Sequence, residues 1–315
     1  MKKIITLTLN PALDKSIAVP QLVPEKKLKA SGAKTEPGGG GINVSRALHK
    51  LGVDSRAVYL SGGYTGKQFD TLLAAEGVAA VPLPIKNDMR ENFVVLDEYS
   101  NAQYRFGMEG PQVEPDEWLD SLQYISEQDD IAYIVASGSL PPGVPADIFG
   151  QLAVIAKQKN ARLVVDTSGD ALKYAVQKGV FLVKPNLSEL AGLYGKEKLG
   201  KEEIVTAARS MIRKSCCEIM VVSMGGDGAM LVTATEQFQV TPPKQKIQST
   251  VGAGDSMVAG LVAALSKEWE LEDVLRYGVA AGSAATLNAG TELCKKEDTE
   301  RLFAEMKQPA VAAMS

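Results

Sequence analysis

One aspartate follows a glycine-rich turn and precedes an apolar segment in the last quarter of the chain. Residues 249–256 read STVGAGDS, and small apolar residues follow at 257–265. Glycines let the backbone turn tightly and approach a ligand, and the apolar run predicts a buried helix that begins at this turn. A helix N-terminus attracts anions, so Asp255 beside it suits a base that accepts a hydroxyl proton during phosphoryl transfer. A helix cap with no chemistry fits the same residues.

A second glycine-rich stretch lies near the N-terminus and also leads into a helical pattern. Residues 37–46 read PGGGGINVSR, and the apolar spacing predicts a helix over 42–51 that ends at Gly52. A glycine loop that runs directly into such a helix is typical of a ligand loop, here with Asn43 at its end. A flexible linker is the alternative, but linkers rarely continue straight into a well-patterned helix.

Polar residues follow two predicted strands, and each set has a ligand-binding and a structural interpretation. Asp14 lies in a turn after the strand predicted at 4–9, where ligands bind in α/β folds. It either reaches substrate hydroxyls or caps the turn. Asn186 and Glu189 are spaced i, i+3 at the start of a predicted helix, so both can face one ligand. The same spacing fits a helix cap with glutamate at its third position.

Two other features argue for a carboxylate as the catalytic base. Residues 62–67 read GGYTGK and resemble a phosphate-binding P-loop, but Ser61 and Gln68 break that motif at its first glycine and its magnesium-binding hydroxyl. The single histidine, His49, lies among predicted packing residues of a helix, and one histidine cannot form a multi-histidine metal site. We therefore discard the P-loop and expect a carboxylate base.

Whole-chain composition is that of an ordinary soluble protein. The 315 residues suffice for one large domain or two modest ones, and 45% are hydrophobic and 23% charged. A net charge of −4 argues against nucleic-acid or anionic-membrane partners. We see no membrane-spanning run, no signal peptide and no CxxC pair. We therefore expect a reduced, cytoplasmic protein whose three cysteines (Cys216, Cys217 and Cys294) are packing residues.

Alternating strand and helix patterns must position these residues. Strands are predicted at 4–9, 57–60, 79–82, 131–136, 162–166, 181–184 and 218–223, then a hairpin at 229–240, with helices at 66–76, 146–160, 170–178, 271–288 and 297–307. Continuous apolar strands joined by helices argue for a parallel sheet covered on both faces. Residues 15–36 and 90–106 instead alternate polar and apolar residues, which predicts a separate small sheet.

The two glycine-to-helix motifs, with the Asn-x-x-Glu between them, resemble the ribokinase-like (PfkB) family of sugar kinases. Residues 38–43 are similar to the family's N-terminal signature and 251–255 to its C-terminal Gly-Ala-Gly-Asp signature. Residues 138–144 (GSLPPGV) and 278–288 (GVAAGSAATLN) are also similar, so the resemblance covers nearly the whole chain. It implies a three-layer α/β/α domain (1–14, 37–89 and 107–315) and a small β lid (15–36 and 90–106). Such kinases often form homodimers clasped through their lids.

The resemblance also implies a role for each matching residue. Asp255 would be the base, with the N–H groups of Gly252, Ala253 and Gly254 as the anion hole. Residues similar to the family's sugar-phosphate site are Asp14, Lys27, Gly38, Gly39, Asn43, Arg90, Arg105 and Ser139, with Lys27 reaching a partner subunit's site. Residues similar to its nucleotide site are Lys184, Asn186, Ser223, Gly225, Gly228, Thr250, Val251, Ser283 and Asn288. Glu189 is similar to the magnesium-linked glutamate, and some relatives bind a monovalent cation such as K⁺ near 249–251 and 285–292.

We expect transfer of the γ-phosphoryl group of ATP to fructose 6-phosphate, giving fructose 1,6-bisphosphate, with Mg²⁺ as cofactor. Cations in the predicted lid (Lys27, Lys29, Arg90 and Arg105) favour a phosphorylated acceptor, because guanidinium and ammonium groups bind phosphate. Solvated surface charge is the alternative explanation for that cluster. Val23, Ser188 and Glu292 depart from the pattern of the family's phosphofructokinases, so the resemblance does not extend to allosteric inhibition by ATP.

Three other functions remain open from the sequence. Fructose 1-phosphate or tagatose 6-phosphate could be the acceptor, because these kinases share nearly all the motifs. A non-catalytic sugar-phosphate-binding protein on the same fold is possible, although such a protein could lose Asp255 and this chain keeps it. An NAD-binding oxidoreductase would need Gly-x-Gly-x-x-Gly after the first strand, and Asn43 occupies the place of the last glycine.

Overall fold

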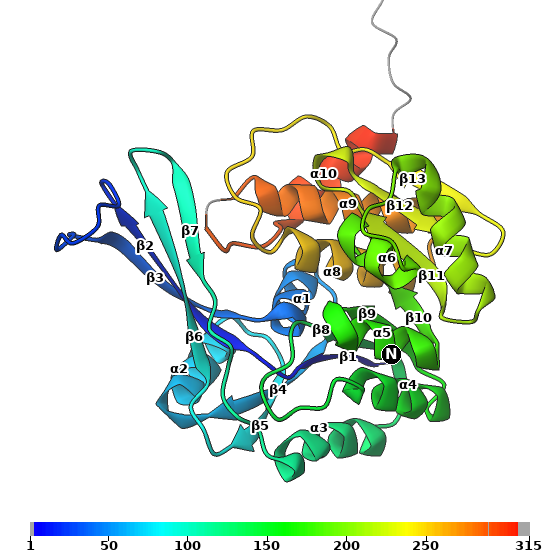
Figure 1. The fold of residues 1–315 in the computed structure, drawn as a ribbon, viewed down its shortest axis with the longest axis horizontal. Helices are drawn as coiled ribbons and strands as arrows, with labels where there is room; N and C mark the ends of the chain where they lie inside the picture. Colours follow the sequence, from blue (N-terminus) through cyan, green and yellow to red (C-terminus); the bar gives the residue numbers. More distant parts are fainter. Residues whose placement is uncertain (1–2, 289, 308–315) are drawn as a thin grey trace, which may run out of the picture.

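A computed structural model describes residues 3–288 and 290–307, and within them nine strands form one large sheet (Figure 1). These are β1 (Lys3–Thr8), β4 (Arg56–Gly62), β5 (Ala80–Ile85), β8 (Ile131–Ser137), β9 (Arg162–Asp166), β10 (Val180–Val183), β11 (Cys217–Ser223), β12 (Ala229–Val232) and β13 (Gln237–Val240). Their order is β13-β12-β11-β10-β9-β8-β1-β4-β5. The strands from β11 to β5 run parallel, and β12 and β13 are antiparallel.

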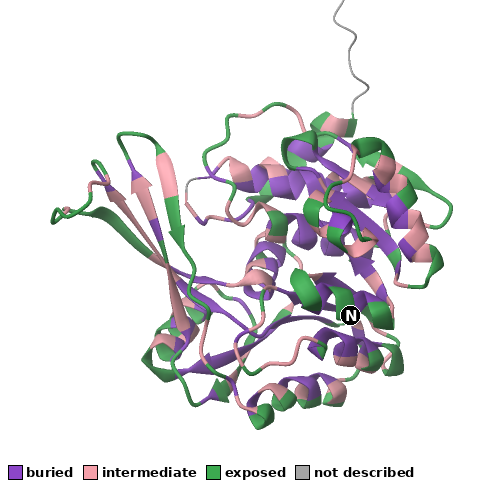
Figure 2. Ribbon diagram, viewed as in Figure 1, coloured by how far each residue is buried: buried purple, intermediate pink, exposed green. Residues whose placement is uncertain are grey.

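Helices cover both faces of this sheet and make a three-layer α/β/α arrangement. One face carries α1 (Gly40–Lys50), α2 (Gly63–Ala75), α8 (Ala253–Ser266), α9 (Leu271–Thr286) and α10 (Lys296–Lys307). The other carries α3 (Pro115–Glu127), α4 (Ile148–Gln158), α5 (Gly169–Lys178), α6 (Leu187–Tyr194) and α7 (Ile204–Arg213). Adjacent strand residues enter opposite cores, Ile4 with α1 and α8 and Ile5 with α4 and α5, so the sheet is buried on both sides (Figure 2).

A second sheet of four strands stands apart from the large one, beside α1 and α2 (Figure 1). Its order is β3 (Ser31–Gly38), β2 (Ala12–Val19), β6 (Arg90–Asp97) and β7 (Ala102–Phe106). Register divides its side chains between two faces, because paired residues point the same way and successive residues alternate. Asp14 pairs with both Glu36 and Asn92 and shares one face with them, whereas Phe93 and Phe106 pair on the opposite face.

The parallel α/β class and the separate small sheet are confirmed, and the predicted strands lie within a few residues of the observed ones. Two helices, α3 and α7, were not predicted. His49 is exposed in the last turn of α1, so its predicted packing role is wrong. The division into domain and lid stays a prediction; β2 begins at Ala12, inside the range assigned to the domain. Among the described residues, no helix has the length and apolar character needed to span a bilayer.

Candidate active site

The predicted ligand loops meet at the carboxyl ends of β1 and β8, where the strand order reverses direction. From β1 the chain adds β4 and β5 on one side and β8 to β11 on the other. Such a switch point is where open α/β sheets bind ligands. The first turn of α1 fits closely against it: a Cβ on Gly40 would lie 2.6 Å from Gly138 N, and one on Gly41 would lie 2.6 Å from Thr8 Oγ1. Glycine therefore lets a helix N-terminus, with its free N–H groups, approach both strand ends.

Asp255 lies in the first turn of α8, after Gly252, whose φ of 72° is left-handed. Asn43 Nδ2 donates a hydrogen bond of 2.9 Å to Asp255 Oδ2, joining two motifs that are 212 residues apart. Burial raises the pKa of Asp255 to about 6, and the nearby Asp166 carboxylate adds to this. Asn43 and Lys184 act in the opposite direction. The arrangement therefore holds a carboxylate that is ionised at neutral pH yet basic enough to accept a proton.

A buried cation stands beside the glycines that precede Asp255. Lys184 Nζ lies 3.0 Å from Asp166 Oδ1, and a Cβ on Gly254 would lie 3.8 Å from the same nitrogen. Burial opposes the charged form of Lys184, but the carboxylates of Asp166, Asp255 and Glu189 raise its pKa overall. The sequence analysis did not identify Asp166; its place at the end of a predicted strand is the signal that could have found it.

The predicted sugar-phosphate residues gather on the other side of Asp255. A Cβ on Gly38 would overlap Asp14 Oδ2, and Asn92 Nδ2 donates to Asp14 Oδ1 at 2.9 Å. Burial raises the pKa of Asp14, although Asn92 and Arg90 oppose the shift. Arg90 donates to Met108 O at 2.7 Å and Asn10 O at 2.8 Å, and burial lowers its pKa against the attraction of Asp14.

Of the remaining predicted substrate residues, three lie near Asp255 or Asn10 and one does not. Gly39 lies at the start of α1 with a φ of 112°, and Ser139 Oγ lies 3.2 Å from Asn10 Nδ2. Arg105 of β7 reaches across to Thr250 Oγ1 at 3.4 Å, so the small sheet touches the motif that contains Asp255. Lys27 is exposed in the turn between β2 and β3, and the structure does not bring it to the residues around Asp255, a region that we call the cleft.

Asn186 and Glu189 form a reciprocal capping box at the start of α6. Glu189 N donates to Asn186 Oδ1 at 2.9 Å, and Asn186 N donates to Glu189 Oε2 at 2.8 Å. The structural interpretation of this pair is thus present in the fold, and their ligand roles stay predictions. Both residues are nevertheless close to the cleft, since Asn186 bridges Ser223 at the end of β11 and Glu189 acts on Lys184.

The other predicted nucleotide residues surround the loop after β11 and the start of α8. Gly225 begins the 3₁₀ turn Gly225–Asp227 and Gly228 follows it. A Cβ on Gly225 would face open space, whereas one on Gly228 would overlap Val240 O. Val251 N donates to Ser249 Oγ, and Ser283 is partly buried in α9. Asn288 is buried, and its amide donates to Ala284 O and Leu293 O rather than pointing toward the cleft.

A network that the sequence analysis missed joins the small sheet to the body of the protein. Glu36 of β3 accepts a hydrogen bond from Thr291 Oγ1 and lies 3.0 Å from Lys34 Nζ. Arg46 of α1 lies 3.7 Å from the same carboxylate and pairs in a bidentate manner with Glu76 at 2.6 and 2.7 Å. Burial would raise the pKa of Glu36, but these hydrogen bonds and cations lower it overall.

Metal-ligating side chains are sparse at this site. Within residues 3–288 and 290–307, no three His, Cys, Asp or Glu side chains come together as a metal cluster. Mg²⁺ is commonly held by one or two carboxylates plus substrate phosphates and waters, and the carboxylates near Lys184 fit that mode.

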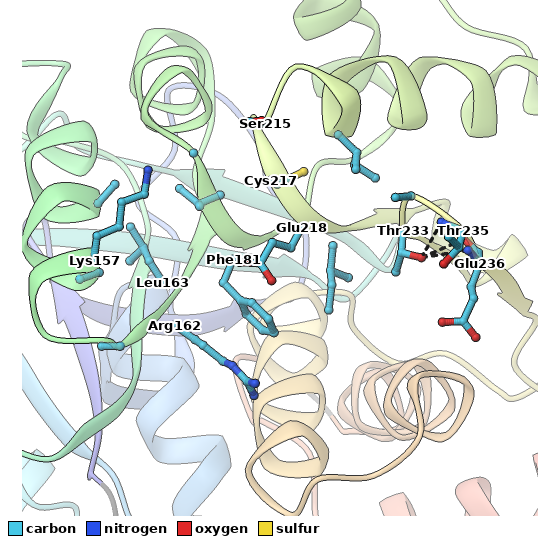
Figure 3. Close-up of a pocket in the computed structure, with 18 residues that line it drawn as sticks. Lys157, Arg162, Leu163, Phe181, Ser215, Cys217, Glu218, Thr233, Thr235 and Glu236 are labelled. Carbon is cyan, nitrogen blue, oxygen red and sulfur yellow. Dashed lines mark hydrogen bonds between the residues drawn. The ribbon is translucent and has the colours of Figure 1, made fainter.

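A separate hollow of about 650 Å³ lies at the amino ends of the strands, opposite the ends that carry Asp166 and Ser223 (Figure 3). The first residues of β9, β10 and β11 line it, and Arg162 stacks on Phe181 there with 4.8 Å between the guanidinium and the ring centre. None of the predicted site residues lines this hollow. Ligands of parallel sheets bind at the carboxyl ends of strands, so the cleft around Asp255 is the candidate active site.

Comparison with known proteins places this geometry among sugar kinases. A model of the family described as "pfkB family carbohydrate kinase" matches residues 7–298. The chain is 42% identical over 309 residues to ATP-dependent 6-phosphofructokinase isozyme 2 of Escherichia coli (strain K12), covering 98% of this chain and 100% of the relative. It is 35% identical over 307 residues to 1-phosphofructokinase of Bacillus subtilis (strain 168), covering 96% and 98%.

Solved structures of the Escherichia coli phosphofructokinase-2 show the same fold. Its complexes with potassium and with fructose-6-phosphate align with TM-scores of 0.94 and 0.93 at 42% and 41% identity. Its tetrameric inhibited form aligns with a TM-score of 0.93 at 41% identity. Each alignment covers 98% of this chain and 100% of the other.

Proposed function

The chain belongs to the pfkB family of carbohydrate kinases, as the resemblance predicted, and from this premise we propose that it phosphorylates fructose 6-phosphate with ATP. The observation that carries the proposal is the junction of Asn43 and Asp255 at two facing helix N-termini. Arginine and serine lie on one side of that junction and a buried lysine on the other. A sugar phosphate and a nucleoside triphosphate would thus meet at one carboxylate.

Asp255 acts as the base in this proposal. With a pKa of about 6 it is mostly ionised at neutral pH, and it accepts the proton of the sugar hydroxyl as that oxygen attacks phosphorus. Asn43 orients the carboxylate through its amide. The N–H groups of Gly252, Ala253 and Gly254, beside the Lys184 cation, stabilise the negative charge on the transferred group. Mg²⁺, held with Glu189, would neutralise phosphate charge.

The acceptor phosphate is proposed to lie against Arg90, Arg105 and Ser139, with Asp14 and Gly38 to Asn43 around the sugar. Arg90 uses two of its five N–H groups on backbone carbonyls and keeps the others for a ligand. The nucleotide is proposed to occupy the side of Lys184, Asn186, Ser223, Gly225, Gly228, Thr250, Val251, Ser283 and Asn288. The buried Asn288 amide would act there through the backbone it holds.

We propose a homo-oligomer formed through the small sheet, and the two unlike faces of that sheet support the proposal. The face with Asp14 and Arg105 points to the cleft, and the opposite face carries Ile17, Phe93, Val95, Tyr104 and Phe106 in register. Phe93, Tyr104 and Phe106 are 36%, 42% and 49% exposed. A second copy of this chain would cover such an apolar face, and the exposed Lys27 would then serve the neighbouring site.

A monovalent cation is proposed beside the same cleft, at 249–251 and 285–292, of which residue 289 lies outside the described part. Ser249 Oγ donates to Gly290 O at 2.6 Å, and Gln248 N donates to Thr286 O, so backbone oxygens gather there. A potassium complex is known for the Escherichia coli relative. Replacing K⁺ by a large organic cation in the assay buffer would lower activity if this proposal holds.

One comparison supports a second candidate acceptor. The 35% identity to a 1-phosphofructokinase leaves fructose 1-phosphate as the alternative substrate, since both acceptors place a phosphate on a ketohexose.

An ADP-release assay with Mg-ATP tests the proposal. The acceptors are fructose 6-phosphate, fructose 1-phosphate, tagatose 6-phosphate and fructose. We expect the highest kcat/KM with fructose 6-phosphate. A preference for fructose 1-phosphate would transfer the same mechanism to the alternative acceptor, and activity only with fructose would contradict the phosphate pocket.

A further inference from the structure

Buried polar atoms without partners concentrate beside the acceptor pocket. Across the described residues, five buried side-chain atoms lack a hydrogen-bond partner: Thr8 Oγ1, Asn10 Oδ1, Arg90 Nε, Trp118 Nε1 and Arg209 Nε. Three of the five belong to the last residue of β1, to the turn that follows it and to the arginine that contacts this turn. Buried polar groups are normally satisfied, so such a concentration marks a place whose polar groups are arranged for something other than stability.

Asn10 connects three segments at this place. Its Nδ2 donates to Glu109 O at 2.9 Å and to Ser139 Oγ at 3.2 Å, and its backbone oxygen accepts from Arg90 at 2.8 Å. Asn10 therefore holds two of the three residues that are proposed to bind the acceptor phosphate, Ser139 and Arg90. It was in a predicted turn, but the sequence analysis gave it no role.

The direction of these hydrogen bonds decides what the pocket offers. Because the Ser139 hydroxyl accepts from Asn10, its own hydrogen is free to donate outward. Because one Arg90 nitrogen is tied to the Asn10 carbonyl, the guanidinium is held in one orientation. Outward donors are what a phosphate needs, since it only accepts hydrogen bonds when fully ionised.

Packing keeps the Asn10 amide in this position. The residue is 3% exposed. Gly110 has a φ of 108°, and a Cβ there would overlap Asn10 Oδ1, so glycine leaves the room that the amide fills. An asparagine with only a structural role would pair both ends of its amide, whereas here the donor end is used on Ser139 and the acceptor end is left unpaired.

We propose that Asn10 is a positioning residue that makes this site selective for a phosphorylated acceptor. It does so by turning Ser139 into an outward donor and by fixing Arg90. This inference rests on the proposed function of the same cleft.

Two substitutions at Asn10 separate this role from a contribution to folding. Asn10→Ala removes the donor to Ser139. Asn10→Asp offers only acceptors, so the Ser139 hydroxyl would donate inward and face the phosphate with its lone pairs. We expect the KM for fructose 6-phosphate to rise about tenfold in Asn10→Ala, as for one lost hydrogen bond that serves a charged group, and further in Asn10→Asp. The KM for ATP and kcat should stay within about twofold.

Tyr133→Phe is the matched control, because the Tyr133 hydroxyl donates to Leu265 O, at the opposite end of α8 from Asp255, and accepts from Arg162. It should leave both KM values unchanged. Equal changes in both KM values, a smaller effect of Asn10→Asp than of Asn10→Ala, or no change for fructose 6-phosphate would each overturn the inference. If Asn10→Ala or Asn10→Asp does not fold, the same KM measurements are made on Asn10→Ser instead.

The wild-type protein distinguishes this failure from that of the proposed function. If the wild-type protein phosphorylates a sugar phosphate and the Asn10 variants keep its KM values, only the role of Asn10 is contradicted. Wild-type activity on unphosphorylated sugars alone would remove the proposed function and this inference with it.

Discussion

At the scale of single residues, opposing electrostatic influences set the pKa of the Asp255 carboxyl group. The helix N-terminus, Asn43 and Lys184 favour its ionised form, whereas burial and the Asp166 carboxylate favour its protonated form. Burial prevails, and the pKa rises to about 6. The sequence suggested the helix N-terminus, which by itself favours the ionised form. It could not show how strongly two loops and a second carboxylate would enclose the group.

Asp255→Asn should lower kcat by about 10²–10⁴, the usual contribution of a general base. The amide keeps the shape and the neighbours of the carboxylate, so substrate dissociation constants should change little. Asp273→Asn is a suitable control, because Asp273 also lies in the first turn of a helix but pairs there with Arg276 and Lys307. An unchanged kcat in Asp255→Asn, measured at saturating substrates, would contradict the assignment of the base.

Activity should depend on pH through the same group. The base must be ionised, so kcat/KM should fall about tenfold per pH unit below an apparent pKa near 6. A fall in kcat/KM that begins only near pH 4 would mean that the folded protein does not raise the pKa of Asp255.

Stability supplies an independent check with a definite sign. The folded protein holds a proton on Asp255 up to about pH 6, whereas the unfolded chain releases it near the ordinary aspartate pKa of 3.8. This contribution is therefore present at low pH and is lost as the pH rises through 6. Urea unfolding should show Asp255→Asn to be more stable than the wild-type protein at pH 8, with a smaller difference at pH 5.

At the scale of elements, the Glu36–Thr291 contact couples the small sheet to the loop before α10. Leu293, two residues along, fills the space beside Gly252, where a Cβ would lie 2.6 Å from its Cδ2. A strand of the small sheet is thus connected in two steps to the start of α8, and the position of one should influence the other.

Thr291→Val should destabilise the fold by about 1–3 kcal/mol at pH 7, because it leaves a buried carboxylate short of one donor. The folded pKa of Glu36 is lowered, so its contribution to stability is present above the ordinary glutamate pKa of 4.5 and is lost as the pH falls below it. The loss should therefore be smaller at pH 4. Thr299→Val, which removes a hydrogen bond to a neutral carbonyl, should show no such dependence in urea unfolding.

Most elements of the large sheet could be predicted because their signals are local. Apolar runs bounded by glycine and polar turns mark β8 to β11, and glycine turns mark α1 and α8. Helix α3 also has a local signal that was overlooked: Glu114 and Glu117 form a capping box around Pro115 at its first position. Helix α7 is recognisable from Ile204, Ala207, Ala208 and Met211 on one face.

The site could be predicted only in part, because its electrostatics depend on distant segments. The glycines of the two loops and Asp255 can be identified from sequence motifs. The pairing of Lys184 with Asp166, and of Glu36 with Thr291, needs the strand order and the loop after α9, which no local pattern provides. Asn10 was overlooked because an asparagine before a proline is an ordinary turn residue.

At the scale of the whole molecule, the unlike faces of the small sheet predict assembly. Tyr104→Asp places a charge in the centre of the proposed contact and should shift the wild-type oligomer toward monomer in analytical ultracentrifugation. Tyr64→Asp is the control, since Tyr64 is 85% exposed on α2 and is not part of that face. A wild-type monomer, or a Tyr104→Asp protein of unchanged mass, would contradict the lid contact.

The alternation of β6 and β7 also limits how this protein can diverge. Val94 and Arg105 pair toward the cleft while Phe93 and Phe106 pair away from it, one residue apart on each strand. A single inserted or deleted codon ahead of Arg105 in β7 would turn the following side chains of that strand over, sending Arg105 outward and Phe106 inward. Substrate binding and subunit contact would be lost in the same event. Descendants of this chain can therefore vary these strands by substitution, while changes of length are tolerated in the turns at 20–30 and 98–101.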